Sequence, residues 1–367
     1  MHLRRVYPFE YNLIRILILI NLWILGCKLY RNPFKSIRVI IRLLHKYSKT
    51  IGAKKIVRGF KLNGTYRWDM FSPPWPTKAF NKFCSSHLLD IEPVHGENKS
   101  LKRIIVAITK ICPLQCEHCC ESATLYNKDF LSCKELIDKI EPFVQNSLGQ
   151  IIYSGGEPIS RFNDLLSLIS HFNKRSDQWI YTSGFGLTQE KAFQLKKAGL
   201  NGAAISLDNH SEEEHNAFRG NGKSFEWVIN AIKNLQAADI FVAINVCPTK
   251  KYIDSGGLVK LIDFAKEMHV SMINFLEPRA VGNYEDKDVE LNLNQKNYLL
   301  NLSHQFNFER KYFLYPTIFY PASFKNADRC GGGHNYIFMD YDGKLYPCPY
   351  CKTQISAPSE KELCEAV

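Results

Sequence analysis

Several features that this chain of 367 residues lacks already narrow its class. Its 12 cysteines are too sparse for a small secreted domain that disulfides hold together. No low-complexity tract occurs, and a composition of 45% hydrophobic and 23% charged residues is ordinary for a globular protein. The apolar stretch Leu13–Leu25 is shorter than a membrane-spanning helix, which needs about 20 residues. Arg15 and Asn21 also interrupt it, which argues against a span.

Acidic residues are almost missing from the first 61 positions. This segment holds 14 Lys and Arg but only one acidic residue, Glu10, so its net charge is +13 while the rest of the chain sums to −2. A nucleic-acid-binding enzyme more often carries its basic patch on the folded body. We therefore expect no nucleic-acid partner and interpret residues 1–61 as a separate basic arm.

Part of this arm, Phe34–Lys46, has the pattern of an amphipathic helix. Apolar and basic residues occupy different faces of it: Ile37, Ile40, Ile41 and Leu44 on one, Lys35, Arg38, Arg42 and Lys46 on another. Helices of this type lie in membrane interfaces, where anionic lipid attracts each basic residue by about 1 kcal/mol. Two alternatives are a helical layer packed on the body and a cleaved lipoprotein signal ending at Gly26-Cys27.

From about residue 101 to 277, strand-like and helix-like runs alternate. The expected strands are Ile104–Thr109, Gln150–Tyr153, Trp179–Thr182, Gly202–Ser206, Phe241–Val246 and Met272–Leu276. The expected helices are Lys134–Gln145, Asn163–Asn173, Gln189–Ala198, Phe225–Ala238 and Gly257–Met268. This alternation predicts an α/β fold with a parallel sheet and outer helices. Because a full eight-unit barrel takes about 250 residues, six units predict a partial (β/α)6 barrel.

Three cysteines, Cys112, Cys116 and Cys119, follow the first expected strand in the run ICPLQCEHCC. Three thiolates at this spacing on a loop that leaves a strand can bind three irons of a [4Fe-4S] cube, so the fourth iron stays open. Zinc is the alternative metal, with His118 or Cys120 as its fourth ligand.

The later strands end in further short motifs, where barrels of this kind collect their chemistry. In chain order these are Ser154-Gly155-Gly156-Glu157-Pro158, Thr182-Ser183-Gly184, Ile205-Ser206-Leu207-Asp208 with the following Arg219, Asn245, and Glu277. Two adjacent glycines let the backbone approach a ligand closely, and a nearby carboxylate can bind an ammonium group.

The cysteine triplet and these motifs, in this order, resemble the radical S-adenosylmethionine (SAM) superfamily over about residues 101–351. The resemblance implies a [4Fe-4S] cluster on the three cysteines and a bound SAM. Its implied SAM-binding residues are Gly155, Gly156, Glu157 and Pro158 for the amino group, Ser206 and Arg219 for the carboxylate, Asn245 for the adenine or ribose, and Ser183 and Asp208 nearby. Asn209 departs from the glycine that relatives commonly have beside Asp208.

The resemblance also implies a reaction. An electron donor such as flavodoxin or ferredoxin supplies one electron, SAM is cleaved, and a 5′-deoxyadenosyl radical abstracts hydrogen from a substrate. A non-catalytic zinc or iron-sulfur binding protein is the alternative, and the GGEP and ISLD runs argue against it because a metal scaffold needs neither.

A second cysteine group lies near the C-terminus: Cys330, Cys348, Cys351 and Cys364. Asp342-Gly343 predicts a tight turn between strands Tyr336–Met339 and Lys344–Tyr346. This region resembles the opening of SPASM or twitch extensions, which implies one auxiliary Fe-S cluster on the four cysteines. Zinc is again the alternative, since hairpins with four cysteines commonly bind it.

The expected organisation has four parts: the basic arm 1–61, an aromatic and Pro-rich connection 62–100, the core 101–280, and a linker helix with the auxiliary-cluster region 281–367. The remaining cysteines, at positions 27, 84, 133 and 247, are interpreted as small buried hydrophobes. We expect a peptide, protein or lipid-linked substrate. The expected location is the cytoplasm, peripheral on the inner face of an anionic membrane.

Overall fold

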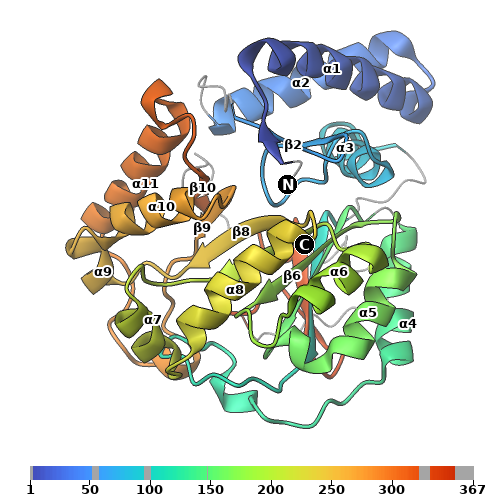
Figure 1. Ribbon diagram of the computed structural model, residues 1–367. Helices are drawn as coiled ribbons and strands as arrows, with labels where there is room; N and C mark the ends of the chain where they lie inside the picture. Colours follow the sequence, from blue (N-terminus) through green and yellow to red (C-terminus); the bar gives the residue numbers. More distant parts are fainter. Residues whose placement is uncertain (1–2, 52–57, 95–100, 147, 322–330, 352–367) are drawn as a thin grey trace.

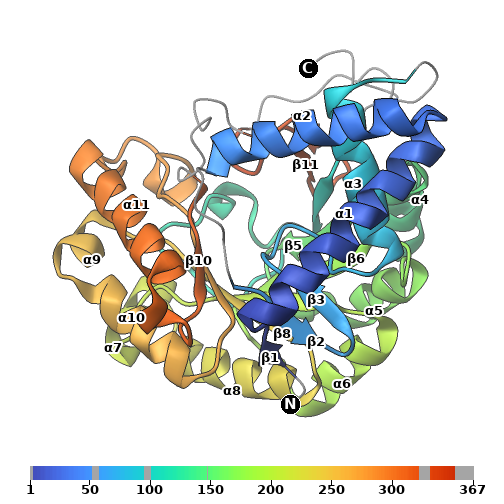
Figure 2. The same ribbon diagram turned by 90° about the horizontal axis from the view of Figure 1, so that it is seen from above.

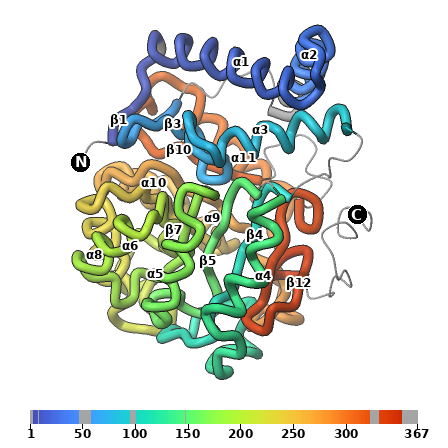
Figure 3. The backbone as a smooth tube through the Cα atoms, turned by 90° about the vertical axis from the view of Figure 1, so that its right-hand side faces the viewer, coloured from blue at the N-terminus to red at the C-terminus, as the bar shows by residue number. Residues whose placement is uncertain are grey.

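The computed structural model describes residues 3–51, 58–94, 101–146, 148–321 and 331–351 (Figure 1). An α/β body carries a separate layer of helices and a small sheet built from the N-terminal residues. Figure 3 shows this N-terminal layer along one side of the body.

The six expected strands are confirmed within two residues at either end: β4 (Arg103–Thr109), β5 (Gln150–Gly155), β6 (Asp177–Thr182), β7 (Gly202–Ser206), β8 (Phe241–Val246) and β9 (Met272–Phe275). Each pairs in parallel with its neighbours. The five expected helices are confirmed equally well as α4 (Cys133–Gln145), α5 (Phe162–His171), α6 (Gln189–Ala198), α8 (Ser224–Ala237) and α10 (Gly257–Glu267). Figure 2 shows these helices in an arc outside the strands.

Two further parallel strands extend this sheet, so the expectation of six strands with a separate hairpin was incomplete. The strand β10 (Thr317–Phe319) pairs with β9, and β11 (Tyr336–Met339) pairs with β4 at the other edge. The predicted turn is confirmed, and it joins β11 to β12 (Leu345–Tyr346). The sheet order is therefore β10-β9-β8-β7-β6-β5-β4-β11-β12.

Shorter elements connect these strands. They are η1 (Ser122–Thr124), η2 (Pro158–Arg161), α7 (Glu212–Arg219), α9 (Lys250–Asp254), η3 (Gly282–Tyr284), α11 (Leu293–Phe308) and η4 (Arg310–Tyr312). The helix α11 stands where a linker helix was expected after the core.

The sheet has an apolar core on each face, as alternation along β4 illustrates. Ile104, Val106 and Ile108 pack toward the outer helices, whereas Ile105 and Ala107 pack on the inner face. Aromatic residues from the N-terminal segment fill part of this inner core. The ring of Phe60 lies edge-on to that of Phe241, at the start of β8, with 5.4 Å between the ring centroids. The inner face is therefore closed near the amino ends of the strands.

This closure is made by a small antiparallel sheet and one helix. The elements are β1 (Arg4–Arg5), β2 (Phe60–Leu62), β3 (Thr65–Arg67) and α3 (Lys78–Ile91). The sequence also suggests an irregular connection over Tyr66–Cys84, and this was wrong from Lys78 on, because the helix α3 begins there. The missed signal is the side chain of Thr77, which accepts a hydrogen bond from Phe80 N–H and caps α3.

A buried ion pair fixes this segment to the body. The guanidinium of Arg67 contacts the Asp177 carboxylate at 2.6 Å, and both side chains are nearly inaccessible to solvent. Gln150 and Trp179 also donate to the same carboxylate, at 2.9 and 3.0 Å. Every oxygen of this buried charge therefore has a donor, as burial requires.

Two helices, α1 (Pro8–Tyr30) and α2 (Pro33–Ile51), form the outermost layer (Figures 1 and 3). They pack on α3 through an apolar cluster that includes Leu22, Val39, Leu43 and Leu88. The expected amphipathic helix is confirmed as α2. The apolar helix α1 is longer than the stretch noted in the sequence, and Phe9–Tyr30 is long and apolar enough to cross a membrane by length and composition alone.

Replacing Arg67 by Met leaves Asp177 charged in the core without its main partner. Breaking a buried pair in this way costs about 3–5 kcal/mol, so the free energy of unfolding measured by urea denaturation should fall by that amount. The control Lys311→Met breaks an exposed pair with Glu309 and should cost less than about 1 kcal/mol. Equal losses in the two variants would contradict this role of Arg67.

Candidate active site at the carboxyl ends of the strands

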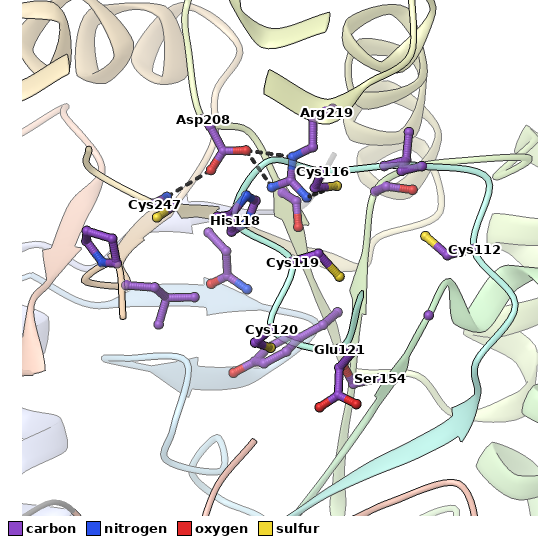
Figure 4. Close-up of a pocket in the computed structure, with 18 of the residues that line it drawn as sticks. Cys112, Cys116, His118, Cys119, Cys120, Glu121, Ser154, Asp208, Arg219 and Cys247 are labelled. Atoms are coloured by element: carbon purple, nitrogen blue, oxygen red, sulfur yellow. Dashed lines mark hydrogen bonds and ion pairs between the residues drawn. The ribbon is translucent and has the colours of Figure 1, made fainter. Parts of the chain in front are cut away.

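One loop carries the three cysteines and surrounds part of a pocket at the carboxyl end of the sheet. Residues 110–121, between β4 and η1, form neither helix nor strand. Cys112, Cys116 and Cys119 all line the pocket, with Cys116 buried and the other two half-buried (Figure 4). Because this loop has no regular structure of its own, neighbouring elements must hold its shape.

The end of β5 fixes the start of this loop. Gly156 donates its N–H to the carbonyl of Thr109 at 2.7 Å, and Glu157 donates to that of Ile111 at 2.8 Å. A Cβ on Gly155 would lie 2.2 Å from the Thr109 oxygen, and one on Gly156 would lie 2.4 Å from the Ile111 oxygen. The sequence interpretation had these glycines approach a ligand, but in this structure the close approach they permit is to the end of β4 and the start of the cysteine loop.

The end of α7 holds the middle of the loop. The N–H of Glu117 donates to the carbonyl of Phe218 at 2.9 Å, and the ring of Phe218 stacks on His118 at 4.7 Å. At Gly220 the backbone has φ near +66°, and a Cβ there would lie 2.6 Å from the carbonyl oxygen of Gln115. Only glycine meets both conditions without strain.

The segment after β9 holds the last part of the loop. Asn283 donates its backbone N–H to the Cys119 carbonyl at 3.0 Å and its side-chain amide to the Cys116 carbonyl at 2.9 Å. Tyr284 donates its hydroxyl to the carboxylate of Glu117 at 3.0 Å. Two of the three cysteines are thus positioned through their own backbone carbonyls.

A buried lysine joins both ends of the loop to the C-terminal hairpin. Lys110 has no exposed surface, and its ammonium group forms ion pairs with Glu121, at the end of the loop, and with Asp340, directly after β11. The contact to Asp340 measures 2.6 Å. A buried cation between two carboxylates is strongly held, because removing either partner leaves an uncompensated charge.

A second buried ion pair lies against the thiol of Cys116. Arg219 contacts the Asp208 carboxylate at 2.5 Å and the Cys116 sulfur at 3.6 Å. Burial lowers the pKa of Arg219, but Asp208 and Cys116 outweigh it, so the pKa stays above its ordinary value. Burial raises the pKa of Asp208, but the charge of Arg219, together with His118, His215 and the Cys247 N–H, lowers it below its ordinary value. The pair therefore stays charged and places a cation beside a thiol.

For the thiols of Cys112 and Cys119, no neighbouring positive charge outweighs the effect of burial on the pKa. Burial raises the pKa of Cys112 to about 12 and also raises the pKa of Cys119. Their conversion to thiolates consequently needs a bound cation, because a metal holds a coordinating thiol in its deprotonated form.

The Glu157 carboxylate is fully satisfied by protein donors. One oxygen accepts from Ile159 N–H at 3.1 Å and the Thr182 hydroxyl at 2.8 Å, and the other accepts from the N–H and hydroxyl of Ser183 at 2.7 and 2.6 Å. Burial raises the pKa of Glu157, and these bonds partly offset the rise. Its described contacts tie the end of β5 to the end of β6, whereas the sequence interpretation assigned it to the ammonium group of a ligand.

Most of the expected site residues meet in this one pocket. Those that line it are Cys112, Cys116, Cys119, Gly155, Gly156, Glu157, Ser183, Ser206, Asp208, Arg219 and Asn245. Pro158 begins η2 and is absent from the lining. Glu277 lines the pocket as well, accepting a hydrogen bond from Tyr320 at 2.8 Å.

Sequence reasoning missed several lining residues, among them Tyr181, Tyr284, Tyr350 and Cys247. Tyr181 and Cys247 stand at the end of an expected strand, which was the available signal. Tyr284 and Tyr350 come from segments whose position depends on long-range pairing. Cys247 was interpreted as a small buried hydrophobe; it is buried, but it also faces the pocket.

Two of the four cysteines of the predicted auxiliary site, Cys348 and Cys351, lie within the described residues. Cys348 is buried and Cys351 exposed, and Cys351 N–H donates to the Cys348 carbonyl at 3.2 Å. Cys330 and Cys364 lie outside the described residues. Tyr350, between the two described cysteines, reaches the pocket wall, so this segment borders the site of the first three cysteines.

The pocket fits a [4Fe-4S] cluster. In such a cluster each thiolate binds a different iron, so the cysteines need to line one cavity but not to converge on one point. The described residues contain no group of three Cys, His, Asp or Glu placed to hold a single metal ion. The buried Nδ1 of His118 also lacks a hydrogen-bond partner among the described residues, and burial lowers the pKa of this imidazole to about 4.

Part of the chain matches a known protein family, and the chain is similar to several known proteins. Residues 106–254 match the family model "Radical SAM superfamily". The chain is 28% identical to an AdoMet-dependent heme synthase of Methanosarcina barkeri, over 66% of this chain and 75% of that protein. It is 24% identical to a PqqA peptide cyclase of Streptomyces rochei, over 71% of this chain and 72% of that protein.

Solved structures share the fold. Streptococcus suis SuiB bound to S-adenosylmethionine superposes with a TM-score of 0.56 at 14% identity, over 73% of this chain and 65% of SuiB. SuiB bound to its precursor peptide SuiA gives 0.58 at 14% identity, over 78% of this chain and 69% of SuiB. The family model thus identifies residues 106–254 of this chain as a radical SAM superfamily domain.

Proposed function

We propose that this protein is a radical SAM enzyme that abstracts hydrogen from a peptide or protein substrate. The observation that carries the proposal is the single pocket lined by Cys112, Cys116 and Cys119 and by residues from the ends of four further strands. When bound, the [4Fe-4S] cluster and SAM supply a 5′-deoxyadenosyl radical after one-electron reductive cleavage of the sulfonium.

The residues of the chain have distinct parts in this proposal. The three cysteines hold the cluster, and Arg219 compensates the thiolate charge on Cys116 from 3.6 Å. Ser183, Ser206 and Asn245 present polar groups on the pocket wall toward SAM. Glu157 acts as a positioning residue, because its carboxylate is occupied by backbone and hydroxyl donors that shape the 182–184 turn.

The pocket wall formed by the segment after β9 and by Tyr350 favours binding of a polar substrate. Glu277 and Arg279 both line the pocket and lie 3.8 Å apart, and Tyr284 and Tyr350 add hydroxyl groups. Burying such charged and polar groups against an acyl chain is costly, whereas a peptide backbone supplies hydrogen-bond partners. The relatives named above act on different substrates according to their names, so the peptide assignment rests on this wall.

A second Fe-S cluster at the C-terminal cysteines is part of the proposal. Cys348 and Cys351 lie beside Tyr350, which borders the pocket, so a cluster there has a short route for an electron to or from the substrate. Zinc at the same cysteines is the structural alternative.

Replacing Cys116 by Ala leaves two ligands for the first cluster. We expect about four irons per chain to be lost after anaerobic reconstitution, and 5′-deoxyadenosine formation with dithionite and SAM to disappear. Cys133→Ala is the matched control, since this half-buried cysteine in α4 is not part of the pocket lining. Cleavage of SAM by the Cys116→Ala variant would refute the assignment.

Replacing Glu157 by Gln puts an amide NH2 against donors of Ser183 or Thr182. A hydrogen bond to a charged group contributes about 1.5–3 kcal/mol, so we expect SAM to bind about 10- to 100-fold more weakly in equilibrium dialysis. The exposed Glu190→Gln change in the first turn of α6 is the control. Unchanged SAM affinity in Glu157→Gln would show that the turn does not depend on this carboxylate.

Replacing Cys348 by Ala tests the C-terminal centre separately. The wild-type chain should reconstitute with about eight irons, and the variant with about four, because one complete [4Fe-4S] cluster is lost. Metal analysis before and after reconstitution measures this. Loss of one zinc with iron unchanged would make the site structural and would contradict the second cluster.

A further inference from the structure

The outer side of α1 is mostly apolar. Eight large side chains on it are exposed: Phe9, Leu13, Ile16, Leu17, Leu19, Ile20, Trp23 and Ile24. At 100° per residue they cover one side of the helix. The opposite side, with Ile14 and Leu22, is buried. Only 17% of the apolar stretch is buried, so α1 is not a core helix.

The exposed part of α2 is divided into an apolar and a basic half. Its exposed apolar residues are Phe34, Ile37, Ile41 and Leu44. On the basic half, Lys35 and Arg42 form ion pairs with Glu92, which follows the end of α3, at 3.4 and 2.8 Å. The basic half of α2 therefore faces Glu92, and helical geometry places the apolar half on the other exposed side of α2.

The inner side of α1 is fixed to the rest of the protein. Asn21 donates to the side chain of Asn81 in α3 at 2.8 Å, and the hydroxyl of Tyr30 donates to the Leu88 carbonyl at 2.8 Å. At the start of α1, Arg4 and Glu10 form an ion pair at 2.7 Å. A transmembrane placement of α1 would remove these contacts, and an in-plane placement keeps them.

We propose that this outer face of α1 and α2 docks in the plane of an anionic lipid bilayer. Twelve large exposed apolar side chains on two packed helices far exceed the scattered hydrophobes of an ordinary surface. Exposed basic residues flank them: Lys28, Arg31, Arg38 and Lys46. Such a rim attracts anionic headgroups, whereas in a symmetric dimer through this face it would meet its own like charges.

The docked orientation places the pocket away from the lipid. The small sheet β1–β3 and α3 lie between α1–α2 and the body, and they close the amino ends of the strands (Figures 1 and 3). The pocket is lined by residues at the opposite, carboxyl ends. The membrane is thus a location for the protein, and the substrate enters the pocket from the aqueous side.

Vesicle flotation with the full chain tests the docking. Vesicles of 70% phosphatidylcholine and 30% phosphatidylglycerol should bind the protein, and pure phosphatidylcholine vesicles or 1 M salt should reduce the bound fraction several-fold. The triple variant Leu13→Ser, Ile16→Ser, Ile20→Ser should bind at least tenfold more weakly. The matched control Phe130→Ser, Phe193→Ser, Leu293→Ser removes exposed apolar residues elsewhere and should bind like wild type.

Two results would overturn the proposal. In the first, the wild-type protein does not float with vesicles and sediments as a dimer, while the Leu13/Ile16/Ile20 variant is a monomer. This result would assign the face to a second copy of the chain. In the second, alkaline carbonate fails to extract the vesicle-bound protein. This result would show that α1 is a transmembrane helix and not an in-plane helix. Release by carbonate, with the triple variant unbound, supports in-plane docking. None of these readouts depends on SAM cleavage, so they are independent of the proposed enzyme activity.

Discussion

The irregular loop 110–121 is the constraint on which the rest of this site depends. It must present three thiols to one cavity, yet it has no helix or strand to keep its shape. Four elements outside the loop hold its form: the glycines at the end of β5, the end of α7, the segment after β9, and the C-terminal hairpin, whose Asp340 pairs with the buried Lys110 of the loop. The sheet supports the site chiefly by placing these four elements at one end of its strands.

The same contacts connect the cluster loop to the proposed SAM site. Gly155 touches the end of β4 and Gly156 touches the start of the loop, while the next residue, Glu157, binds the turn after β6. Arg219 lies between Asp208 and the sulfur of Cys116. A change in any of these motifs therefore acts on both the ligands of the cluster and the surface that faces SAM. At the other end of the strands, the Arg67–Asp177 pair holds the N-terminal segment that closes the body and carries α1 and α2.

Local pattern predicted much of this structure and failed where distant segments meet. The six strands, five helices and the hairpin turn at Asp342-Gly343 were readable because apolar periodicity and turn chemistry are local. The pairing of β11 with β4 could not be predicted, because the sequence of a four-residue strand does not indicate which sheet edge it will join. The pocket residues that were predicted were found from the motifs at the strand ends and from the family resemblance that these motifs carry. The partners of Glu157 and the roles of Lys110 and Tyr350 depend on side-chain contacts across the fold, which spacing does not encode.

Electron paramagnetic resonance of the reconstituted, dithionite-reduced protein, recorded with and without SAM, tests the central claim most directly. If Cys112, Cys116 and Cys119 leave one iron open, the reduced [4Fe-4S] cluster should give a spectrum whose g-values change when SAM is added. The Cys348→Ala variant simplifies this measurement by removing the signal of a second cluster. An iron-sulfur signal that is unaffected by saturating SAM, or a protein that takes up only zinc, would contradict the account.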